Sequence, residues 1–367
     1  MISKKTVLGV YSDSTLNNLE LSLIQTDGVD LYETPVSLLR PYPSDLKNDI
    51  YNLMLKGDFS DVNQLNSLSD RLTRFHTEVI TEFINIHKRA YPQIDLIGYS
   101  GHTVYQNPTE KINITLGDSQ KIASHFKIAV VSRFLQSDLM AGGRGGPLFA
   151  SFYDAMTRNL NKPVGVISIG GILTMTSIGP YGDMEAFDCS IGTVLLDHWI
   201  FKKTGAEMDY NGKYAKFGSI DKALLNRLLK EEYLLKQPPK TIRRESFMEY
   251  YKHVEGCSIE TGAATLTAFI AHSLRNSIQY LKTKPTHWIL TGGGIYNPTL
   301  VQMIKAIFSE PIKTASDLEW QNDTLNAQGY AFLAVRSLMG LPITFPSTSG
   351  AYEAVTGGHL FMPENID

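Results

Sequence analysis

The chain has few cysteines and lacks a long apolar run. Its 367 residues include two cysteines, Cys189 and Cys257, which cannot form a disulfide framework and fit a reducing compartment. No stretch approaches the ~18 consecutive apolar residues that a membrane-spanning helix needs. The apolar run near the N-terminus is too short for a signal peptide. We therefore expect a cytoplasmic protein that makes no use of a membrane.

An excess of one charge and several common site motifs are also absent. The formal net charge is −3 with a pI near 6.3, which gives no electrostatic basis for binding nucleic acid. The nine histidines are scattered without zinc-ligand spacing. Neither the Walker motif G-x-x-x-x-G-K-[ST] nor the Rossmann motif G-x-G-x-x-G occurs. The hydrolase elbow G-x-S-x-G fails at its last position, which is His102.

What the chain does contain predicts an α/β protein with two domains. Hydrophobic residues make up 43% of a chain long enough for two cores. The segments 6–11 and 19–24 are typical of a strand hairpin, and 65–90 has the apolar spacing of a long helix. Strands, a glycine turn, a further strand and a helix recur in the second half. We interpret this order as a duplicated architecture.

The segment from Met184 to Trp199 is the strongest candidate for chemistry. It is typical of a strand ending at Asp188, then a glycine turn, then a helix that Ser190 or Thr193 could cap. An acid beside a helix N-terminus can activate a hydroxyl or water, and the same N-terminus can bind phosphate. The alternative is that Asp188 serves only as a helix cap.

Two further glycine turns follow buried strands. Gly170 and Gly171 come after the strand expected at 164–169, and Gly292–Gly294 come after the strand expected at 287–291. The first turn leads into a further strand, whereas a helix is expected after the second. A strand, a glycine turn and a helix form the phosphate or adenosine cradle of many nucleotide sites. Tight strand-to-helix turns use glycine as well, so Gly292–Gly294 leave both interpretations open.

In colinear order over essentially the whole chain, these segments resemble the anhydro-N-acetylmuramic acid kinases, bacterial sugar kinases of the actin-like ATPase superfamily. The motifs that carry the resemblance include Leu116-Gly117-Asp118, Ile169-Gly170-Gly171-Ile172, Phe187-Asp188 with Gly192, Pro238-Pro239-Lys240, and Gly292-Gly293-Gly294 with Asn297-Pro298.

The resemblance implies two ribonuclease-H-like domains facing an interdomain cleft. We expect the first at 1–160, with a C-terminal strap at 341–367 packing on it, and the second at 161–340. It implies ATP with Mg²⁺ and an amino-sugar substrate. In the implied reaction water opens the 1,6-anhydro bond of the muramic sugar while the γ-phosphoryl group passes to O6. It is also consistent with a homodimer, since members of the family associate.

The resemblance also implies roles for particular residues. Asp188 matches the catalytic base. The phosphate-contacting and nucleotide-side glycines match Gly170, Gly171, Gly192, Gly292, Gly293 and Gly294. The first phosphate loop matches Ser12, Asp13, Ser14, Thr15 and Asn17, and the sugar side matches Ser100, His102, Asp118 and Asn326.

The chain departs from the family's motifs at polar positions. In the first phosphate loop, G-x-M-S-G-T-S-x-D-G-x-D in the family, Asp13 replaces a glycine and Asn17 replaces an aspartate. A carboxylate at Asp13 would lie beside the ATP phosphates, and like charges repel unless a cation intervenes. The family's S-H-G-Q-T-V has Ser100 and His102 in place of histidine and glutamine, and Asn326 replaces a glutamate.

These observations support three hypotheses. The first is an active sugar kinase of this family, which Asp188 and the glycine turns favour. The second is a non-catalytic sugar- or nucleotide-binding protein or scaffold, which the clustered departures favour. The third, less favoured, is a hydrolase that uses Asp188 to open the sugar without ATP.

Overall fold

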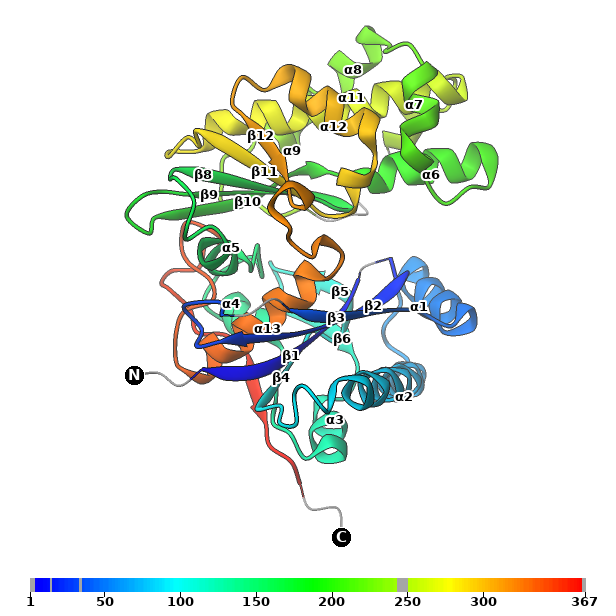
Figure 1. Ribbon diagram of the computed structural model, residues 1–367. Coiled ribbons are helices and arrows are strands. Elements are labelled where there is room, and N and C mark those ends of the chain that lie inside the picture. Colours follow the sequence, from blue (N-terminus) through cyan, green and yellow to red (C-terminus); the bar gives the residue numbers. More distant parts are fainter. Residues whose placement is uncertain (1–3, 14, 33–34, 243–249, 365–367) are drawn as a thin grey trace. The chain divides into compact units, whose positions relative to one another are not determined.

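The chain forms two compact units, each with its own sheet (Figure 1). The computed structural model describes residues 4–13, 15–32, 35–242 and 250–364. Unit 1 is discontinuous in sequence and comprises Met1–Met156, Asp323–Pro346 and Ala351–Asp367. Unit 2 comprises Thr157–Asn322 and Ser347–Gly350.

The sheet of unit 1 has the strand order β13-β7-β4-β1-β2-β3. The strands β1, β2 and β3 form an antiparallel meander, and β4 and β7 continue from β1 in parallel. Their bounds are β1 Lys5–Ser12, β2 Asn18–Thr26, β3 Val36–Pro41, β4 Leu96–Tyr99, β7 Val130–Ser132 and β13 His359–Phe361. A separate hairpin consists of β5 His102–Asn107 and β6 Ile112–Leu116.

Helices from both ends of the chain cover this sheet. Their bounds are α1 Ser44–Lys56, α2 Val62–His87, α3 Ser119–Phe126, α4 Phe134–Met140, α5 Ala150–Met156 and α13 Leu325–Leu338. The long helix α2 is capped by Asp61, whose side chain accepts hydrogen bonds from the first-turn N–H groups of Asn63 and Gln64. Its buried face shares one apolar core with α1 and with strands of the sheet. The helix expected at 65–90 is therefore confirmed, with bounds three residues earlier in the sequence.

The domain boundary expected at residue 340 differs from the division in the structure. Helix α13, orange in Figure 1, packs on β1, β2 and β4 and lies in unit 1, as does the rest of 323–346. Gly9 and Gly98 permit this contact, because a Cβ at these positions would lie 1.8 Å from the Ala327 carbonyl oxygen and 2.3 Å from that of Tyr330. A helix that distant in sequence carries no local signal of the sheet it will cover.

The C-terminal segment after this helix returns to the same sheet. Strand β13 pairs antiparallel with β7 at the sheet edge, and residues 341–346 and 351–364 belong to unit 1. Residues 347–350 instead belong to unit 2, where the Ser347 carbonyl accepts a hydrogen bond from the Ala186 N–H.

The sheet of unit 2 repeats the topology of unit 1. Its order is β10-β9-β8-β11-β12, with an antiparallel meander of β8, β9 and β10 and with β11 and β12 parallel to β8. The bounds are β8 Val164–Ile169, β9 Ile172–Ile178, β10 Met184–Ile191, β11 His287–Thr291 and β12 Ile312–Thr314. When the strands of each sheet are numbered in chain order, and β13 is left aside, the order across both sheets is third, second, first, fourth, fifth. This order confirms the predicted pair of ribonuclease-H-like α/β domains and the inferred duplication.

The helices of unit 2 surround one central helix. Their bounds are α6 Thr193–Thr204, α7 Lys213–Phe217, α8 Lys222–Leu228, α9 Glu232–Leu235, α10 Tyr251–Val254, α11 Ile259–Ser277 and α12 Pro298–Ile307. Helix α11 is buried on nearly every side, because it packs against α6, α7, α8 and α12 as well as the sheet. Its N-terminus is capped by Ser258, whose side chain accepts a hydrogen bond from the Thr261 N–H.

Within the described ranges, none of the helices combines the length and the apolar character needed to cross a membrane.

Candidate active site

Asp188 lies inside strand β10 and not at its end. The strand continues to Ile191, with an irregularity in its pairing to β9 between Asp188 and Ser190. Helix α6 begins at Thr193 after the N-cap residue Gly192, and no side chain caps its N-terminus. The expectations that the strand ends at Asp188 and that Ser190 or Thr193 caps the helix are therefore wrong. The interpretation of Asp188 as only a helix cap is excluded as well.

The Asp188 carboxylate is nearly buried and accepts one hydrogen bond at each oxygen. Asp188 as a whole is 9% exposed. The Thr174 hydroxyl donates to Oδ1 at 3.0 Å, and the Ile242 N–H donates to Oδ2 at 3.1 Å. Burial raises the pKa of Asp188 to about 6, although these two donors and the Lys240 ammonium act in the opposite direction. The carboxylate retains unused lone pairs and is mostly ionised at pH 7.

The segment 233–242 fastens the backbone of Asp188 from the side. The Asp188 N–H donates to the Lys240 carbonyl at 3.1 Å, and the Tyr233 hydroxyl donates to the Asp188 carbonyl at 2.8 Å. Together these bonds fix the backbone position from which the carboxylate projects.

Lys240 is an almost fully buried cation beside this carboxylate. Its ammonium donates to the carbonyl oxygens of Tyr233 and Leu234, both at 3.3 Å. It also lies 4.8 Å from the ring centroid of Tyr280 and 5.7 Å from that of Phe187. Burial lowers the pKa of Lys240, while the nearby Asp188 acts to raise it. Sequence reasoning noted Lys240 only within a motif, since a lysine gives no local sign of burial.

The glycine turns of unit 2 meet at the end of strand β8. A Cβ at Gly192 would lie 2.0 Å from the Gly170 carbonyl oxygen, and one at Gly292 would lie 2.7 Å from the Ile169 carbonyl oxygen. The N–H of Gly192 donates to the Gly171 carbonyl at 2.8 Å. The predicted glycine turns are thus neighbours, because β8 lies between β9 and β11 in the sheet.

The third glycine turn keeps one position open. Gly293 is exposed, and a Cβ there would meet no atom within 4 Å. Its neighbour Gly292 is fixed by Asn322, whose side-chain oxygen accepts from the Gly292 N–H at 2.9 Å. The backbone is therefore tightly packed at Gly192 and Gly292, whereas the space beside Gly293 is open. Sequence reasoning missed Asn322, which lies 30 residues from its partner.

In unit 1, Asp13 folds back into the turn between β1 and β2. Its Oδ1 accepts from the N–H and the hydroxyl of Thr15, both at 2.6 Å, and from the Asn17 N–H at 3.3 Å. Its Oδ2 accepts from the Asn18 N–H at 3.4 Å. The carboxylate therefore occupies the amide groups of its own loop. Ser14 lies outside the described residues.

Asn17 follows in the same turn and faces a cation. Its side-chain oxygen accepts from the Lys47 ammonium at 2.5 Å, and its carbonyl accepts from the Tyr42 N–H at 3.2 Å. The turn is thereby fastened to the start of α1.

The expected sugar-side residues Ser100 and His102 both contact Ser12. The Ser100 hydroxyl oxygen accepts from the Ser12 N–H at 3.1 Å, and the Ser12 Oγ lies 2.9 Å from His102 Nδ1. Parallel pairing of β1 with β4 brings these segments together. His102 is 1% exposed, and burial lowers its pKa to about 4.

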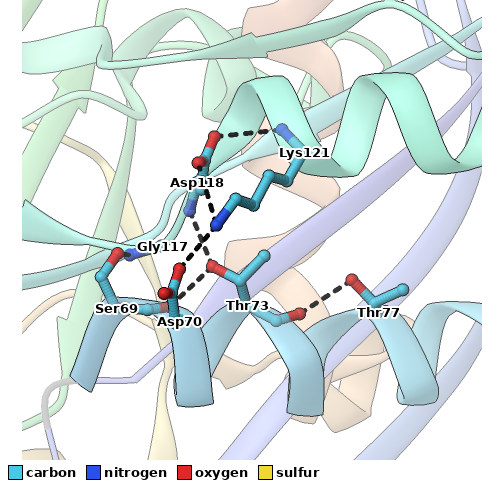
Figure 2. Close-up of polar contacts among 7 residues, drawn as sticks. All are labelled: Ser69, Asp70, Thr73, Thr77, Gly117, Asp118 and Lys121. Atoms are coloured by element: carbon cyan, nitrogen blue, oxygen red, sulfur yellow. Dashed lines mark hydrogen bonds and ion pairs between the residues drawn. The ribbon is translucent and has the colours of Figure 1, made fainter. Parts of the chain in front are cut away.

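Asp118 lies in a different environment from these residues. Its carboxylate caps α3 by accepting from the Lys121 N–H at 3.0 Å, and its own N–H donates to the Thr73 hydroxyl at 2.9 Å. Figure 2 shows the neighbouring ion pair between Lys121 and Asp70, with a separation of 2.7 Å. These contacts account for Asp118 as part of the junction between α2 and α3.

Asn326 contacts a buried acid that sequence reasoning did not single out. Its amide donates to Glu20 Oε1 at 3.4 Å, while Glu20 Oε2 has no hydrogen-bond partner in the part of the chain that the structure describes. Burial raises the pKa of Glu20 well above its usual value. The residue could have been suspected because it interrupts the apolar strand Leu19–Ile24.

The described residues contain no group of three histidine, cysteine or acidic side chains arranged to hold a metal ion. Magnesium at a nucleotide commonly uses one or two carboxylates together with phosphate and water oxygens. The absence of such a group from these residues is therefore no obstacle to Mg²⁺ carried on a nucleotide.

Comparisons with known proteins agree on one family. A family model for anhydro-N-acetylmuramic acid kinase matches residues 5–363. The anhydro-N-acetylmuramic acid kinase of Methylorubrum populi is 32% identical over 99% of this chain and 100% of its own length. That of Paramagnetospirillum magneticum is 32% identical over 97% and 99%, and that of Azorhizobium caulinodans is 33% identical over 97% and 99%.

Proposed function

The chain belongs to the anhydro-N-acetylmuramic acid kinase family, and we propose that Asp188 is its catalytic base. The protein is accordingly a phosphotransferase of the sugar-kinase type. We propose 1,6-anhydro-N-acetylmuramic acid as its substrate and ATP with Mg²⁺ as the phosphoryl donor. The observation that carries the proposal is a nearly buried carboxylate with a pKa of about 6, which accepts two hydrogen bonds while the backbone of the same residue makes two more.

In the proposed reaction Asp188 takes a proton from a water molecule. The water oxygen bonds to C1 of the sugar, the C1–O6 bond breaks, and O6 bonds to the γ-phosphorus as ADP leaves. A base with a pKa near 6 is mostly deprotonated at pH 7 and still accepts a proton readily in the transition state. The hydrogen bonds from Thr174 and Ile242 orient the carboxylate without consuming all its lone pairs.

The glycine turns of unit 2 support a role in nucleotide binding. We propose that Gly170, Gly171 and Gly192 contact the phosphates, and that Gly292, Gly293 and Gly294 line the nucleoside side. Side chains at the tight positions would collide with backbone, so the backbone itself is presented to the ligand. The N-terminus of the twelve-residue helix α6 adds favourable polarity toward phosphate. When bound, Mg²⁺ would neutralise part of the phosphate charge.

For unit 1 we propose that Ser12, Asp13, Thr15 and Asn17 of the β1–β2 turn, with Ser14, form the second phosphate-binding element. We propose Ser100 and His102 as sugar contacts. We propose the same role for Asn326, whose amide also donates to Glu20. Asp118 was also expected to contact sugar, but its capping of α3 supports a structural role more strongly.

A second candidate function is a binding protein without turnover. The self-occupied β1–β2 turn favours it, because the Asp13 carboxylate takes the loop N–H groups that an anionic phosphate would need. Asp13 must release these groups, or a cation must neutralise it, before phosphate binds there.

One set of measurements separates the candidates. Calorimetry with MgATP and with the anhydro-sugar, followed by a coupled ADP assay, is performed on the wild type, Asp188→Asn and Asp13→Gly. We expect wild-type turnover, a loss of at least about 10³-fold in kcat for Asp188→Asn with both ligands still bound, and tighter MgATP binding by Asp13→Gly.

Each alternative has its own signature in these measurements. Sugar binding without nucleotide binding or turnover indicates the binding protein, and sugar opening without ATP indicates the hydrolase. Full turnover by Asp188→Asn removes Asp188 from the mechanism. Unchanged MgATP affinity in Asp13→Gly shows that Asp13 does not oppose phosphate.

Two expectations about the whole protein remain proposals. We propose a homodimer, which analytical ultracentrifugation tests. We also propose a cytoplasmic location, with which the free thiols of Cys189 and Cys257 are compatible, and which cell fractionation tests.

A further inference from the structure

A continuous row of buried hydrogen bonds runs through unit 1. It joins Tyr99, His76, Tyr42, Ser12 and His102, which we call the relay. Tyr99 OH lies 2.8 Å from His76 Nδ1, and His76 Nε2 lies 2.7 Å from Tyr42 OH. Tyr42 OH lies 2.7 Å from Ser12 Oγ, which lies 2.9 Å from His102 Nδ1. All five residues are buried.

The first half of the relay has one consistent direction. The Tyr42 hydroxyl donates to Ser12 Oγ and has only one hydrogen, so His76 Nε2 must donate to Tyr42. Burial lowers the pKa of His76 to about 3, so its ring is neutral and carries a single N–H. His76 Nδ1 is therefore an acceptor, and the Tyr99 hydroxyl donates to it.

The second half follows from the first. Ser12 Oγ already accepts from Tyr42, so its own hydrogen is directed to His102 Nδ1. The His102 ring is neutral at pH 7, since burial holds its pKa near 4. Its one hydrogen must then lie on Nε2.

His102 Nε2 is buried and has no hydrogen-bond partner among the residues that the structure describes. Reversing every bond of the relay would leave two groups unsatisfied, the Tyr99 hydroxyl hydrogen and the His102 Nε2 lone pair. The direction argued above leaves one, a single N–H at His102. The relay thus leaves one unpaired donor, the N–H at His102 Nε2, beside the β1–β2 turn.

We propose that the relay holds His102 Nε2–H as a specificity-determining donor for an uncharged oxygen of the sugar, a hydroxyl or acyl oxygen. Asp13 is the charged group whose field acts on this ring, and it would repel an anionic acceptor. An uncharged oxygen suits a neutral donor in such surroundings. The inference deepens the proposed function and rests on it for the identity of the ligand.

The direction of the relay can be tested without any ligand. The full chain is labelled with ¹⁵N at histidine, and long-range ¹H–¹⁵N correlation reports which ring nitrogen of each histidine is protonated. His76→Gln and His102→Gln assign the signals. We expect the Nε2–H tautomer at both residues, with no protonation of either ring between pH 8 and about 5. An Nδ1–H tautomer at His102 would overturn the inference.

A second variant tests whether the relay fixes this tautomer. Tyr42→Phe frees Ser12 Oγ to accept from His102 Nδ1–H, so a second tautomer should appear at His102. Tyr91→Phe removes a tyrosine hydroxyl of the same unit outside the relay and should leave one tautomer. If Tyr42→Phe also leaves a single Nε2–H tautomer, the relay does not set the direction and the inference fails.

The ligand is tested by adding 1,6-anhydro-N-acetylmuramic acid to the labelled protein. We expect the His102 Hε2 resonance to shift, and the sugar KM of His102→Leu to rise roughly tenfold with a smaller change in kcat, in keeping with one lost hydrogen bond. His102→Gln keeps an N–H donor and should recover part of the loss.

The remaining outcomes separate this inference from the proposed function. Turnover without any response of Hε2 means that a buried water holds the donor, which overturns the inference alone. A sugar-dependent shift without turnover supports the inference and contradicts the kinase proposal. Absence of sugar binding overturns the assigned ligand in both.

Discussion

Asp188 illustrates how a single residue combines catalytic readiness with a cost in stability. Its pKa in the folded protein, about 6, exceeds the value of ~3.9 for an unfolded aspartate. The folded state therefore binds the Asp188 proton more tightly than the unfolded state does. The resulting stabilisation of the folded state is complete below pH ~4. As pH rises through about 6 the effect is lost, which amounts to at most about 3 kcal/mol. Holding a base of this strength thus lowers stability at neutral pH.

The neighbouring cation should tune this base. We expect Lys240→Met to raise the pKa of Asp188, because the Lys240 ammonium is one of the groups that lower it. The acid limb of the kcat/KM profile, near pH 6 in the wild type, should move to higher pH, with severalfold lower activity at pH 6 and a smaller loss at pH 8. Steady-state rates from pH 5 to 9 measure the shift.

Lys236→Met is the matched control, since Lys236 is more than half exposed and pairs with Glu232 in the same segment. Its profile should coincide with that of the wild type. An acid limb that stays in place in Lys240→Met would show that another group sets it.

At the scale of elements, the close approach of α13 to β1 and β4 defines unit 1. Helix and sheet touch backbone to backbone at Gly9 and Gly98, where side chains would be excluded. The same approach brings Asn326, near the start of α13, to Glu20 on β2. Sequence distance hides this junction, because the partners are separated by some three hundred residues.

Gly9→Ala tests the importance of this approach. The added Cβ would lie 1.8 Å from the Ala327 carbonyl oxygen, so α13 must move away from the sheet. We expect a loss of at least about 3 kcal/mol in unfolding free energy, which urea denaturation followed by circular dichroism measures.

The control for this substitution is Gly256→Ala, where the added Cβ meets no atom within 4 Å. Its stability should lie within about 1 kcal/mol of the wild type. Equal stability of the two variants would show that α13 accommodates the methyl group without cost.

At the scale of the whole molecule, one sheet topology occurs twice, and the two copies carry different polar residues and turns. Unit 2 carries the acid and the glycine turns with Gly293 open, whereas unit 1 carries a closed turn and a buried polar relay. The duplicated strand order places the first strand of each sheet at its centre, with a turn beside it. We expect the nucleotide to act mainly on unit 2, with the β1–β2 turn of unit 1 contacting its phosphates, and the sugar to act on unit 1.

Hydrogen exchange read unit by unit tests this division. MgATP at about 100 times its Kd should raise the opening free energy by about 2.7 kcal/mol for amides after β8 and β11 in unit 2. Removal of Mg²⁺ with EDTA should abolish most of this protection, and the sugar should protect amides of β5 in unit 1. Nucleotide-dependent protection confined to β5 would contradict the assigned roles.

Much of this protein is determined by local sequence. Alternating and continuous apolar runs identified most strands, and the apolar spacing of Val62–His87 identified the longest helix. The glycine turns could be found in the sequence because glycine commonly marks positions where the backbone leaves no room for a side chain. Asp188 was found from its setting between a strand and a glycine turn, and the family resemblance followed from colinear motifs.

Only the tertiary structure decided how those residues are used. Burial raises the pKa of Asp188, and Lys240 and Ile242, more than fifty residues away in the sequence, act to lower it. The assignment of α13 to unit 1 and the direction of the relay likewise depend on contacts between distant segments. Local sequence specifies backbone preference and polarity, whereas desolvation and hydrogen-bond partners exist only once remote parts of the chain have packed together.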